Sequence, residues 1–545
     1  VKEDLLNCRE KGETWQKEYV SGCFKDDARF EQPVQRRKVK NFASQALKTK
    51  VTCKDKKIVE LQGTRDLFGR LLYISTVENI DLAKVFTYPL TPVPFSLAQI
   101  DGSPNKTDKS TLMHKLEKFA DSTAPVSVDV VFIDAMFVLH YLQDLPVTFG
   151  EISSMILKHI CSMAHEVHFI ADTYQSPSIK QDERMRRGME TSAYSITGRN
   201  QKRPQSWQTS LRSPAFKTAF LNFLVKHWED DENARTISDH TVYLATENQC
   251  YQYTSIEGKV RCSVSEMYAC KHEEADTKII YHLRKACDHS PNSNYVVRSN
   301  DTDVLVLLLY HSSHFRSTPN VWMDAGLSGN NTRRYINISQ LVQVMEPEFL
   351  DALPGLHAFT GSDFTASFMN KGKLKPLNVM IKSKSHTEAM SKLGEDDEAS
   401  IDLKTSVEKF VCVLYAHPRL CNVNDVRHAL FQRKYAPRKD TDPLKVIKGI
   451  NPSSMPPCKK VLENKLKRAN YVTGIWKKAD TESPTTCSPI GNGWNLENNQ
   501  YTINWYDGDQ LPRALCDVLE EPTDSEDSET EEEACTDSDD ACDSD

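Results

Sequence analysis

Seven acidic side chains stand where apolar segments of the sequence end or where helices are expected to begin. They are Asp134, Asp172, Glu274, Asp276, Asp301, Asp303 and Asp363. Carboxylates that crowd together repel one another and resist ionisation unless a cation compensates their charge. Mg²⁺ and Mn²⁺ take oxygen ligands, and two such ions can stabilise the attacking and leaving oxygens of a phosphodiester displacement. If folding gathers these acids, they predict metal-dependent phosphodiester cleavage.

Each of these acids also has a simpler interpretation. Asp134, Asp172 or Asp303 could be a helix N-cap, a position that aspartate favours. Glu274 and Asp276 could interact favourably with a helix dipole, because acids in a first turn lie near its positive end. The metal-site hypothesis therefore depends on the joint order of the acids rather than on any one of them.

A basic segment from 180 to 213 is the second feature that could do chemistry. It holds three acids against eight basic residues, Lys180, Arg184, Arg186, Arg187, Arg199, Lys202, Arg203 and Arg212. Tyr194 and Trp207 in the same segment are suitable for stacking on bases. The pattern predicts contacts with a nucleic acid, and a solvated helix face is the simpler alternative.

The elements that must position the acids alternate between short apolar runs and helical patterns. Strands are expected at 128–135, 166–172, 242–245, 295–303 and 321–324, and helices at 135–141, 152–163, 215–228 and 274–287. An apolar run at 304–310 follows the fourth strand. This alternation predicts a three-layer α/β/α domain with a mostly parallel central sheet. Ligands of such sheets gather at the carboxyl ends of the strands, where most of the acids stand.

The rest of the chain divides by composition. We expect a polar, poorly defined N-terminal region at 1–120, the α/β domain at 121–400, a mainly helical region at 401–476, a loop or short-strand region at 477–519 and a disordered acidic tail at 520–545. That tail carries 14 acids and no Lys or Arg, so the net charge of −8 becomes +6 for the remaining body. A mildly basic body is compatible with a polyanion partner. The chain starts at Val1 rather than Met, which suggests a fragment.

Composition also argues against several classes of protein. No stretch approaches the ~18 apolar residues that span a bilayer, so no membrane contact is predicted. The 15 cysteines form no dense disulfide framework, which favours reduced thiols and an intracellular location. Cys250, Cys262, Cys270 and His272 could be imagined as a zinc site, but they lack a CxxC pair, so buried thiols are the preferred interpretation.

The order of these motifs resembles the flap endonuclease and XPG family of structure-specific 5′ nucleases, whose catalytic domain is PIN-like. The resemblance covers roughly 128–375, about half of the chain. The matching pieces are 132–136 (FIDAM), 169–172 (FIAD) with the turn and basic run at 175–187, 274–276 (EAD), 300–306 (NDTDVLV) and 361–363 (GSD) with 371–373 (KGK). The chain departs from the family in having Asp276 where the family has Glu, an insertion at 247–270 and no Gly-x-Gly hairpin after Asp363. These departures leave 5′-end specificity open.

The resemblance implies a phosphodiester hydrolase. All seven acids would bind two Mg²⁺ or Mn²⁺ ions, directly or through water, and Lys180 and Arg186 would steer and polarise the scissile phosphate. The segment 180–213 would form an arch over the site, and the partner would be DNA or RNA, which favours a nuclear location. Contacts to nucleic acid are expected from Arg184, Arg187, Arg199, Lys202, Arg203, Lys371 and Lys373.

Two other functions stay open at this point. A PIN-like scaffold could bind nucleic acid without cutting it, although a full set of acids argues against lost turnover. An RNase H-like transposase or integrase also uses acids on strands, but it needs fewer of them. Pieces of the C-terminal region at 456–458, 468–471, 475–476 and 493–494 resemble the tails of animal proteins linked to mobile elements. Whether the seven acids meet in one pocket separates the nuclease from the RNase H-like alternative.

Overall fold

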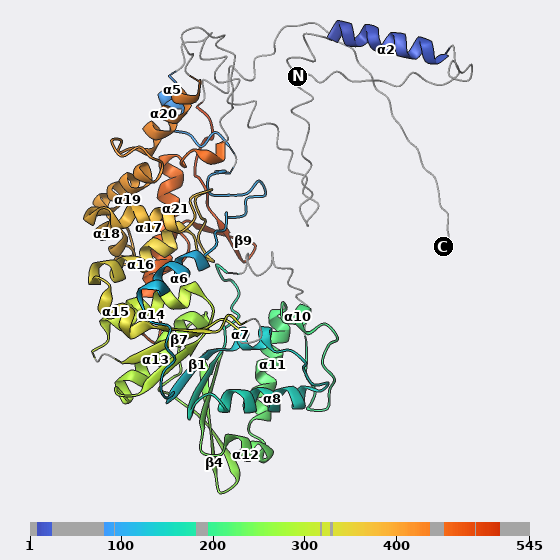
Figure 1. Cartoon of the computed structure of the whole chain (residues 1–545), viewed down its shortest axis with the longest axis vertical. Helices are drawn as coiled ribbons and strands as arrows, with labels where there is room; N and C mark the ends of the chain where they lie inside the picture. Colours follow the sequence, from blue (N-terminus) through green and yellow to red (C-terminus); the bar gives the residue numbers. More distant parts are fainter. Residues whose placement is uncertain are drawn as a thin grey trace.

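The structure, a computed structural model, describes residues 8–23, 81–180, 194–435 and 452–512, apart from 92, 317–318, 328–330 and 486. Figure 1 shows a central sheet with helices on both sides, and the C-terminal helices stacked above it. The expected acidic tail and part of the basic segment, including Arg184, Arg186 and Arg187, lie outside the described residues.

The central sheet has eight strands in the order β5-β4-β3-β2-β1-β6-β7-β8. Strands β3, β2, β1, β6 and β7 are parallel, and β4, β5 and β8 pair antiparallel at the two edges. The strands are β1 (Val130–Asp134), β2 (Glu166–Ile170), β3 (Thr241–Thr246), β4 (Gln249–Ile256), β5 (Lys259–Val264), β6 (Asn294–Arg298), β7 (Asn320–Ala325) and β8 (Arg334–Asn337). A separate hairpin joins β9 (Trp494–Glu497) and β10 (Gln500–Ile503).

The sheet separates two hydrophobic cores. Along β1, Val130 and Phe132 belong to one core, and Val131 and Ile133 belong to the other. Successive side chains of a strand point to opposite faces, so a strand covered on both faces must be apolar throughout. The short continuous apolar runs of the sequence arise from this burial.

Helices cover both faces. On one face lie α7 (Ala135–Tyr141), α8 (Phe149–Cys161) and α11 (Pro214–His227), and on the other α13 (Ala275–His289), α14 (Thr302–His314) and α16 (Pro347–Thr360). Local signals start several of them, including a capping box between Thr148 and Glu151 at α8 and a Ser213 cap followed by Pro214 at α11. The predicted α/β class with helices on both faces of a mostly parallel sheet is confirmed.

Two segments have a structure that the sequence patterns did not specify. The insertion at 247–270 holds the antiparallel hairpin of β4 and β5, which extends the sheet at one edge. The apolar run at 304–310 belongs to helix α14, which is buried on nearly every side. Asp301 and Asp303 were expected to close a strand that ends at residue 303, and this expectation was wrong. Strand β6 ends at Arg298, Asp301 caps α14, and Asp303 lies in the first turn of that helix.

The larger core also includes residues from both sides of the expected domain. Leu97 and Leu112 come from before residue 121, and Trp476 and Trp494 come from after residue 400.

The remaining elements are α2 (Cys8–Cys23), α5 (Leu82–Val85), α6 (Ser110–Leu116), η2 (Glu117–Phe119), α10 (Trp207–Ser210), η3 (Asp231–Asn233), α12 (Ala234–Ile237), α15 (Ile338–Val344), α17 (Leu374–Ile381), α18 (Lys384–Ser391), α19 (Ile401–Leu414), α20 (Val423–Tyr435), η5 (Pro452–Ser454) and α21 (Lys459–Lys477). The domain boundaries themselves stay predictions.

Among the described helices, none combines the length and the apolar character that crossing a bilayer would require.

Candidate functional site

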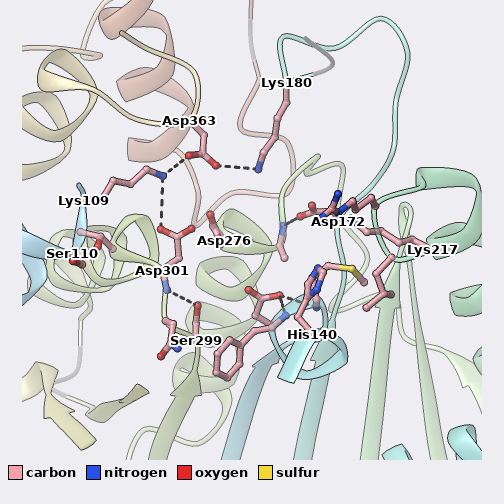
Figure 2. Close-up of a pocket in the computed structure, with 18 of the residues that line it drawn as sticks. Lys109, Ser110, His140, Asp172, Lys180, Lys217, Asp276, Ser299, Asp301 and Asp363 are labelled. Atoms are coloured by element: carbon pink, nitrogen blue, oxygen red, sulfur yellow. Dashed lines mark hydrogen bonds and ion pairs between the residues drawn. The ribbon is translucent and has the colours of Figure 1, made fainter. Parts of the chain in front are cut away.

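The strand order reverses between β1 and β6. From β1 the chain proceeds to β2 and β3 in one direction, whereas β6 and β7 extend in the other. In open α/β sheets, ligands bind in the crevice that forms outside the carboxyl ends of the strands at such a reversal. A cavity of about 980 Å³ opens at this position (Figure 2).

All seven acids that the sequence singled out meet at this cavity. Asp134, Asp172, Asp276, Asp301 and Asp363 line it. Glu274 contacts Lys180, and Asp303 bonds to Lys109, and both lysines also line the cavity. Segments that are far apart in the sequence are thus brought to one place by the sheet topology.

Backbone N–H groups at helix starts hold three of the acids. The Asp134 carboxylate accepts hydrogen bonds from the amides of Met136 at 2.9 Å and Phe137 at 3.2 Å, and it caps α7. Asp301 caps α14 in the same way. Asp172 instead accepts from the Ala275 amide at 2.8 Å, which ties the end of β2 to the start of α13. The capping interpretation therefore holds for Asp134, whereas Asp303 lies in the first turn of the helix that Asp301 caps, and capping is compatible with the gathering of acids.

Lys109 supplies a positive charge to three carboxylates at once. Its Nζ lies 2.6 Å from Asp363, 3.0 Å from Asp303 and 3.9 Å from Asp301. Burial acts to lower the pKa of Lys109, but attraction to Asp303, Asp301 and Asp363 outweighs it and raises this pKa. Lys109 therefore stays an ammonium ion at neutral pH. Sequence reasoning missed this residue, because it lies in the polar N-terminal region within no recognisable motif.

Lys180, which the sequence did single out, holds a comparable position on the other side of Asp363. Its ammonium contacts Glu274, lies 3.8 Å from Asp363 and stands over the ring of Phe364. Burial opposes its charge, yet Glu274 and the other acids raise its pKa well above the ordinary value. Figure 2 shows Asp363 between Lys109 and Lys180.

Several acids nevertheless resist ionisation. Burial, followed by the charge of Asp172, raises the pKa of Asp134 to about 7. Burial raises the pKa of Glu274 to about 7, although Lys180 acts against this rise. Burial and the charge of Asp303 raise the pKa of Asp301 to about 6. Burial and Asp301 raise the pKa of Asp276 well above its usual range. Two lysines are therefore too few cations for the carboxylates gathered here.

Asp363 and Asp303 behave differently. Burial acts to raise the pKa of Asp363, but Lys109 and Lys180 outweigh burial and lower this pKa. Asp303 is affected in a similar way. Burial acts to raise its pKa, but Lys109 and His357 outweigh burial and hold this pKa below its ordinary value. His357 donates from Nε2 to Asp303 at 2.8 Å, and burial lowers the pKa of His357 to about 4, so this donor is a neutral imidazole. His357 was also missed by sequence reasoning, because no local signal distinguishes it from a core histidine.

The donor set suits a hard divalent cation. Asp276, Asp301 and Asp303 each offer a carboxylate oxygen, and these atoms lie within 4.8 Å of one another. Every predicted ligand is a carboxylate, the donor that Mg²⁺ and Mn²⁺ prefer. The raised pKa values of Asp134, Glu274 and Asp301 show that more positive charge would stabilise their ionised forms. The residues present therefore fit the ions that the sequence predicted.

The basic residues predicted from the segment 180–213 have different surroundings. Arg199 pairs with Glu232 at 2.7 Å, and Arg203 donates to backbone carbonyls, among them that of Pro146 at 2.9 Å. Lys202 is exposed. None of these three lines the cavity, so Lys180 and Arg212 are the only basic residues from the described part of the segment that line it.

Lys373 was expected to contact nucleic acid, but its surroundings in the structure do not agree with this expectation. It is 2% exposed, and its Nζ donates to the carbonyls of His357 at 2.8 Å and Gly361 at the end of α16. Burial lowers the pKa of Lys373 well below the ordinary value. A lysine that satisfies these carbonyls does not present its charge to a polyanion. Lys371 is half-buried, and its Nζ lies 3.8 Å from the centre of the Tyr415 ring.

Two basic side chains that the sequence did not assign to the site complete the cavity wall. Lys217 and His140 line the cavity beside Arg212. Figure 2 shows Lys217 and His140 on the side of Asp172, opposite Lys109. Lys217 stands over the Tyr174 ring, 5.4 Å from its centre, and Tyr174 also lines the cavity. Positive charge thus surrounds the acids on two sides.

The zinc alternative gains no support among the described residues. No group of metal-compatible side chains there contains Cys250, Cys262, Cys270 or His272. Cys250 and Cys270 are buried free thiols, and His272 Nε2 lies 2.7 Å from the carbonyl oxygen of Thr481. The preferred interpretation of these cysteines as ordinary thiols agrees with these surroundings.

The chain matches no protein-family model and no curated protein. Among solved structures, it is similar to the catalytic core of Rad2 in complex with DNA substrate (complex III), at 11% sequence identity over 60% of this chain and 83% of that chain, with a TM-score of 0.24. A TM-score this low does not show a shared fold. The family that the sequence motifs resemble therefore stays a prediction, and the functional conclusion depends on the geometry of the cavity.

Proposed function

We propose that this protein is a divalent-metal-dependent nuclease that hydrolyses phosphodiester bonds of DNA or RNA, with a flap endonuclease-like PIN domain. The observation that supports this function is the convergence of acids from separate segments at the strand-order reversal, where five carboxylates line one cavity and Glu274 and Asp303 contact lysines that line it. Three of them have pKa values raised to about 6 or 7, so the cavity lacks positive charge. A site of this kind attracts Mg²⁺ or Mn²⁺ and, through the ions, phosphate.

The carboxylates divide into two groups by their contacts. Asp276, Asp301 and Asp303 form the closest cluster and are the first candidates to hold an ion. Asp134, Asp172, Glu274 and Asp363 surround this cluster and would complete a two-ion site, directly or through water. Bound Mg²⁺ or Mn²⁺ would supply the positive charge that stabilises the attacking and leaving oxygens of the displacement.

The lysines of the cavity act as fixed charges in this proposal. Lys109 and Lys180 have raised pKa values, so neither can serve as a general base at neutral pH. An ammonium held in a buried site can instead stabilise the negative charge that develops on a phosphate in the transition state. Lys180 thus keeps the role that the sequence predicted for it. Lys217 and Arg212 would receive the backbone of the incoming strand.

Two further parts of the proposal depend on the substrate. Arg184, Arg186 and Arg187, which lie outside the described residues, would contact phosphates if their segment forms the arch that the family resemblance implies. A nucleic-acid substrate favours a nuclear location. The convergence of seven acids supports the nuclease over an RNase H-like transposase, which needs fewer. A scaffold that binds nucleic acid without cutting is the remaining alternative, and an assay separates it from the nuclease.

The test uses the purified full chain with single-stranded, flap and hairpin DNA and RNA. We expect cleavage that requires Mn²⁺ or Mg²⁺ and stops with a chelator. Asp301→Asn and Asp276→Asn should each lower the rate by at least about a hundredfold, because each removes a carboxylate that would hold the ion, and the ion supplies the positive charge that stabilises the transition state. Glu388→Gln is the matched control, since this exposed acid forms an ion pair with Lys392 at the end of its own helix.

The outcomes separate the alternatives. Binding without cutting, in the presence of either ion, would support the scaffold instead of the nuclease. Cleavage that is equally fast in Asp301→Asn, Asp276→Asn and the control would place the activity outside this cavity and contradict the proposal.

A further inference from the structure

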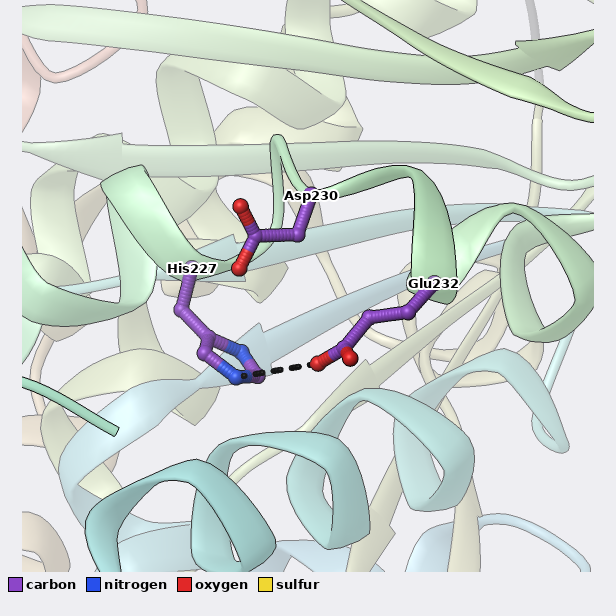
Figure 3. Close-up of side chains that lie close together, drawn as sticks. All are labelled: His227, Asp230 and Glu232. Carbon is purple, nitrogen blue, oxygen red and sulfur yellow. Dashed lines mark ion pairs between the residues drawn. The ribbon is translucent and has the colours of Figure 1, made fainter. Parts of the chain in front are cut away.

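A second group of metal-ligating side chains lies away from the cavity, where helix α11 ends. His227 is the last residue of α11, Asp230 follows in the next turn, and Glu232 belongs to η3. One ligand atom of each residue lies within 4.8 Å of the others. Figure 3 shows the imidazole of His227 facing the carboxylates of Asp230 and Glu232.

His227 is the observation that points to a ligand. It is 4% exposed, and neither Nδ1 nor Nε2 has a hydrogen-bond partner among the described residues. Burial lowers the pKa of His227 despite the nearby acids, so the ring is neutral and offers a lone pair. Its Nε2 lies 3.5 Å from Oε1 of Glu232. This contact would be an ion pair only if the ring were protonated. A buried imidazole without a partner is costly unless something else satisfies it.

The backbone around these side chains is fixed. Asn233 donates from Nδ2 to the carbonyl of His227 at 2.7 Å, and the Val260 amide donates to Asp231 at 3.0 Å. The turn is therefore held against both α11 and the start of β5. Three potential ligands within six residues of the sequence are thus pre-positioned, which reduces the entropy that binding a metal would cost.

Arg199 leaves one oxygen of Glu232 for a metal. Its Nη1 bonds to Oε2 at 2.7 Å, whereas Oε1 faces the His227 ring. The guanidinium thus orients the carboxylate, and it also adds a positive charge that weakens the attraction for a cation. Removing Arg199 should therefore strengthen cation binding. If the Arg199–Glu232 ion pair only held the fold together, removing Arg199 would instead weaken binding.

We propose that His227, Asp230 and Glu232 bind a divalent transition-metal ion, with Zn²⁺ as the representative. An imidazole nitrogen together with two carboxylates suits Zn²⁺ or Co²⁺, whereas Mg²⁺ prefers oxygen ligands alone. Water would complete the coordination. The ion would connect α11 to η3 and, through Glu232, to the segment that carries Arg199. This site is separate from the cavity, and the proposal does not depend on the nuclease function.

The test is a titration of the untagged, metal-stripped full chain with Co²⁺ in excess Mg²⁺, followed by calorimetry and visible absorption. We expect one bound Co²⁺ that persists in Asp301→Asn. His227→Gln and Asp230→Asn should weaken its affinity by about tenfold or more. Arg199→Gln should tighten it severalfold, and His289→Gln, a change at an exposed histidine, should leave it unchanged.

The same variants can overturn the proposal. Co²⁺ binding that disappears in Asp301→Asn but persists in His227→Gln and Asp230→Asn would place the ion in the cavity and contradict the inference. Because His227 is buried and its replacement could unfold the chain, Asp230→Asn at an exposed position tests the site independently. Weaker binding in Arg199→Gln would likewise contradict it.

Discussion

Asp134 and Asp303 belong to the same cavity, yet their carboxyl groups behave in opposite ways. Asp134 accepts its hydrogen bonds from backbone N–H groups of α7, and burial raises its pKa to about 7. Asp303 is more deeply buried, but the Lys109 ammonium and the His357 imidazole hold its pKa below the ordinary value. Asp303 thus has a cation in direct contact, whereas Asp134 is held by hydrogen bonds from backbone amides.

The difference shows what a helix start can and cannot do for a buried charge. Two amide hydrogen bonds at the start of α7 do not offset the loss of water around Asp134. A full positive charge 3.0 Å away does so for Asp303. An added divalent ion therefore changes the electrostatics most on the Asp134 side, and on the Asp303 side it must compete with a lysine.

The largest expected effect comes from removing the cation that contacts Asp303. Lys109→Met leaves three carboxylates without this partner, and breaking a buried ion pair from one side costs about 3–5 kcal/mol of the free energy of unfolding. Chemical denaturation with a chelator present should show this loss. Lys118→Met, at an exposed neighbouring lysine, is the control.

Metal should then rescue Lys109→Met more than the wild type. An ion at a hundred times its Kd adds about 2.7 kcal/mol to either protein, and a larger gain in the variant would indicate that the ion replaces the lysine charge. If Lys109→Met without metal is as stable as the control, the contrast between the two sides is wrong.

The second effect concerns pH on the Asp134 side. Its folded pKa, about 7, exceeds the ordinary value of 3.8, so the folded state binds more protons between these values. The stability of the metal-free chain should fall as pH rises through this window, by at most about 4 kcal/mol from this group. Asp134→Asn, which cannot ionise, should match the wild type near pH 4 and be more stable by about 2–4 kcal/mol at pH 8.

Thermal unfolding across this pH range, with a chelator present, provides the measurement for Asp134→Asn. Asp239→Asn, at an exposed acid, should follow the wild-type profile. If the stability of the wild type changes with pH in the same way as that of Asp134→Asn, ionising Asp134 costs the folded state nothing. That result would show that a positive charge already compensates the Asp134 carboxylate.

A smaller effect is expected from the neutral donor on the Asp303 side. His357→Gln removes the 2.8 Å hydrogen bond to Asp303 and should destabilise the chain by about 1–2 kcal/mol at neutral pH. The pKa of His357 itself is lowered from 6.5 to about 4 in the folded state, so the unfolded wild type binds more protons in this window and the wild type loses stability as the pH falls through it. The deficit of the variant should therefore shrink between about pH 6.5 and pH 4. A deficit that is constant with pH would indicate lost packing against Trp476 instead.

The smallest expected effect is the release of protons when a divalent ion binds. Asp134, Glu274 and Asp301 have pKa values of about 6 to 7, so near pH 6.5 they are partly protonated in the metal-free protein. Binding Mg²⁺ or Mn²⁺ should release about one proton per chain, because carboxylate ligands must ionise. Calorimetry in two buffers of different ionisation enthalpy measures the number. Asp134→Asn should release fewer protons, and a value of zero for the wild type would contradict the raised pKa values.

The sequence predicted the acids because each one follows a local signal. A short apolar run that ends at Asp134 or two residues before Asp172 marks a strand, and the parallel topology brings such ends to one edge of the sheet. The α/β class could be predicted for the same reason. The helical character of 304–310 could not, because an all-apolar run looks alike in a buried strand and in a buried helix.

The charges that balance the acids could not be predicted. Lys109 is 194 residues from Asp303, and His357 is 54 residues from it, so only tertiary packing brings them together. Lys373 misled in the opposite direction. A lysine after glycine in a polar loop suggests exposure, but here it satisfies carbonyls at the end of α16. Local patterns identify groups that stand at element ends, whereas partners from distant segments leave no such pattern.

The position of Lys109 in the chain has a practical consequence. A shortened protein cut to the strand–helix alternation, beginning at residue 121, would omit this lysine together with Leu97 and Leu112, whose side chains pack under the sheet. Such a fragment would expose part of its interior to water and leave Asp301, Asp303 and Asp363 without their shared ammonium. If such a fragment were inactive or insoluble, the truncation itself would explain the result, and nothing would follow about the activity of the whole chain.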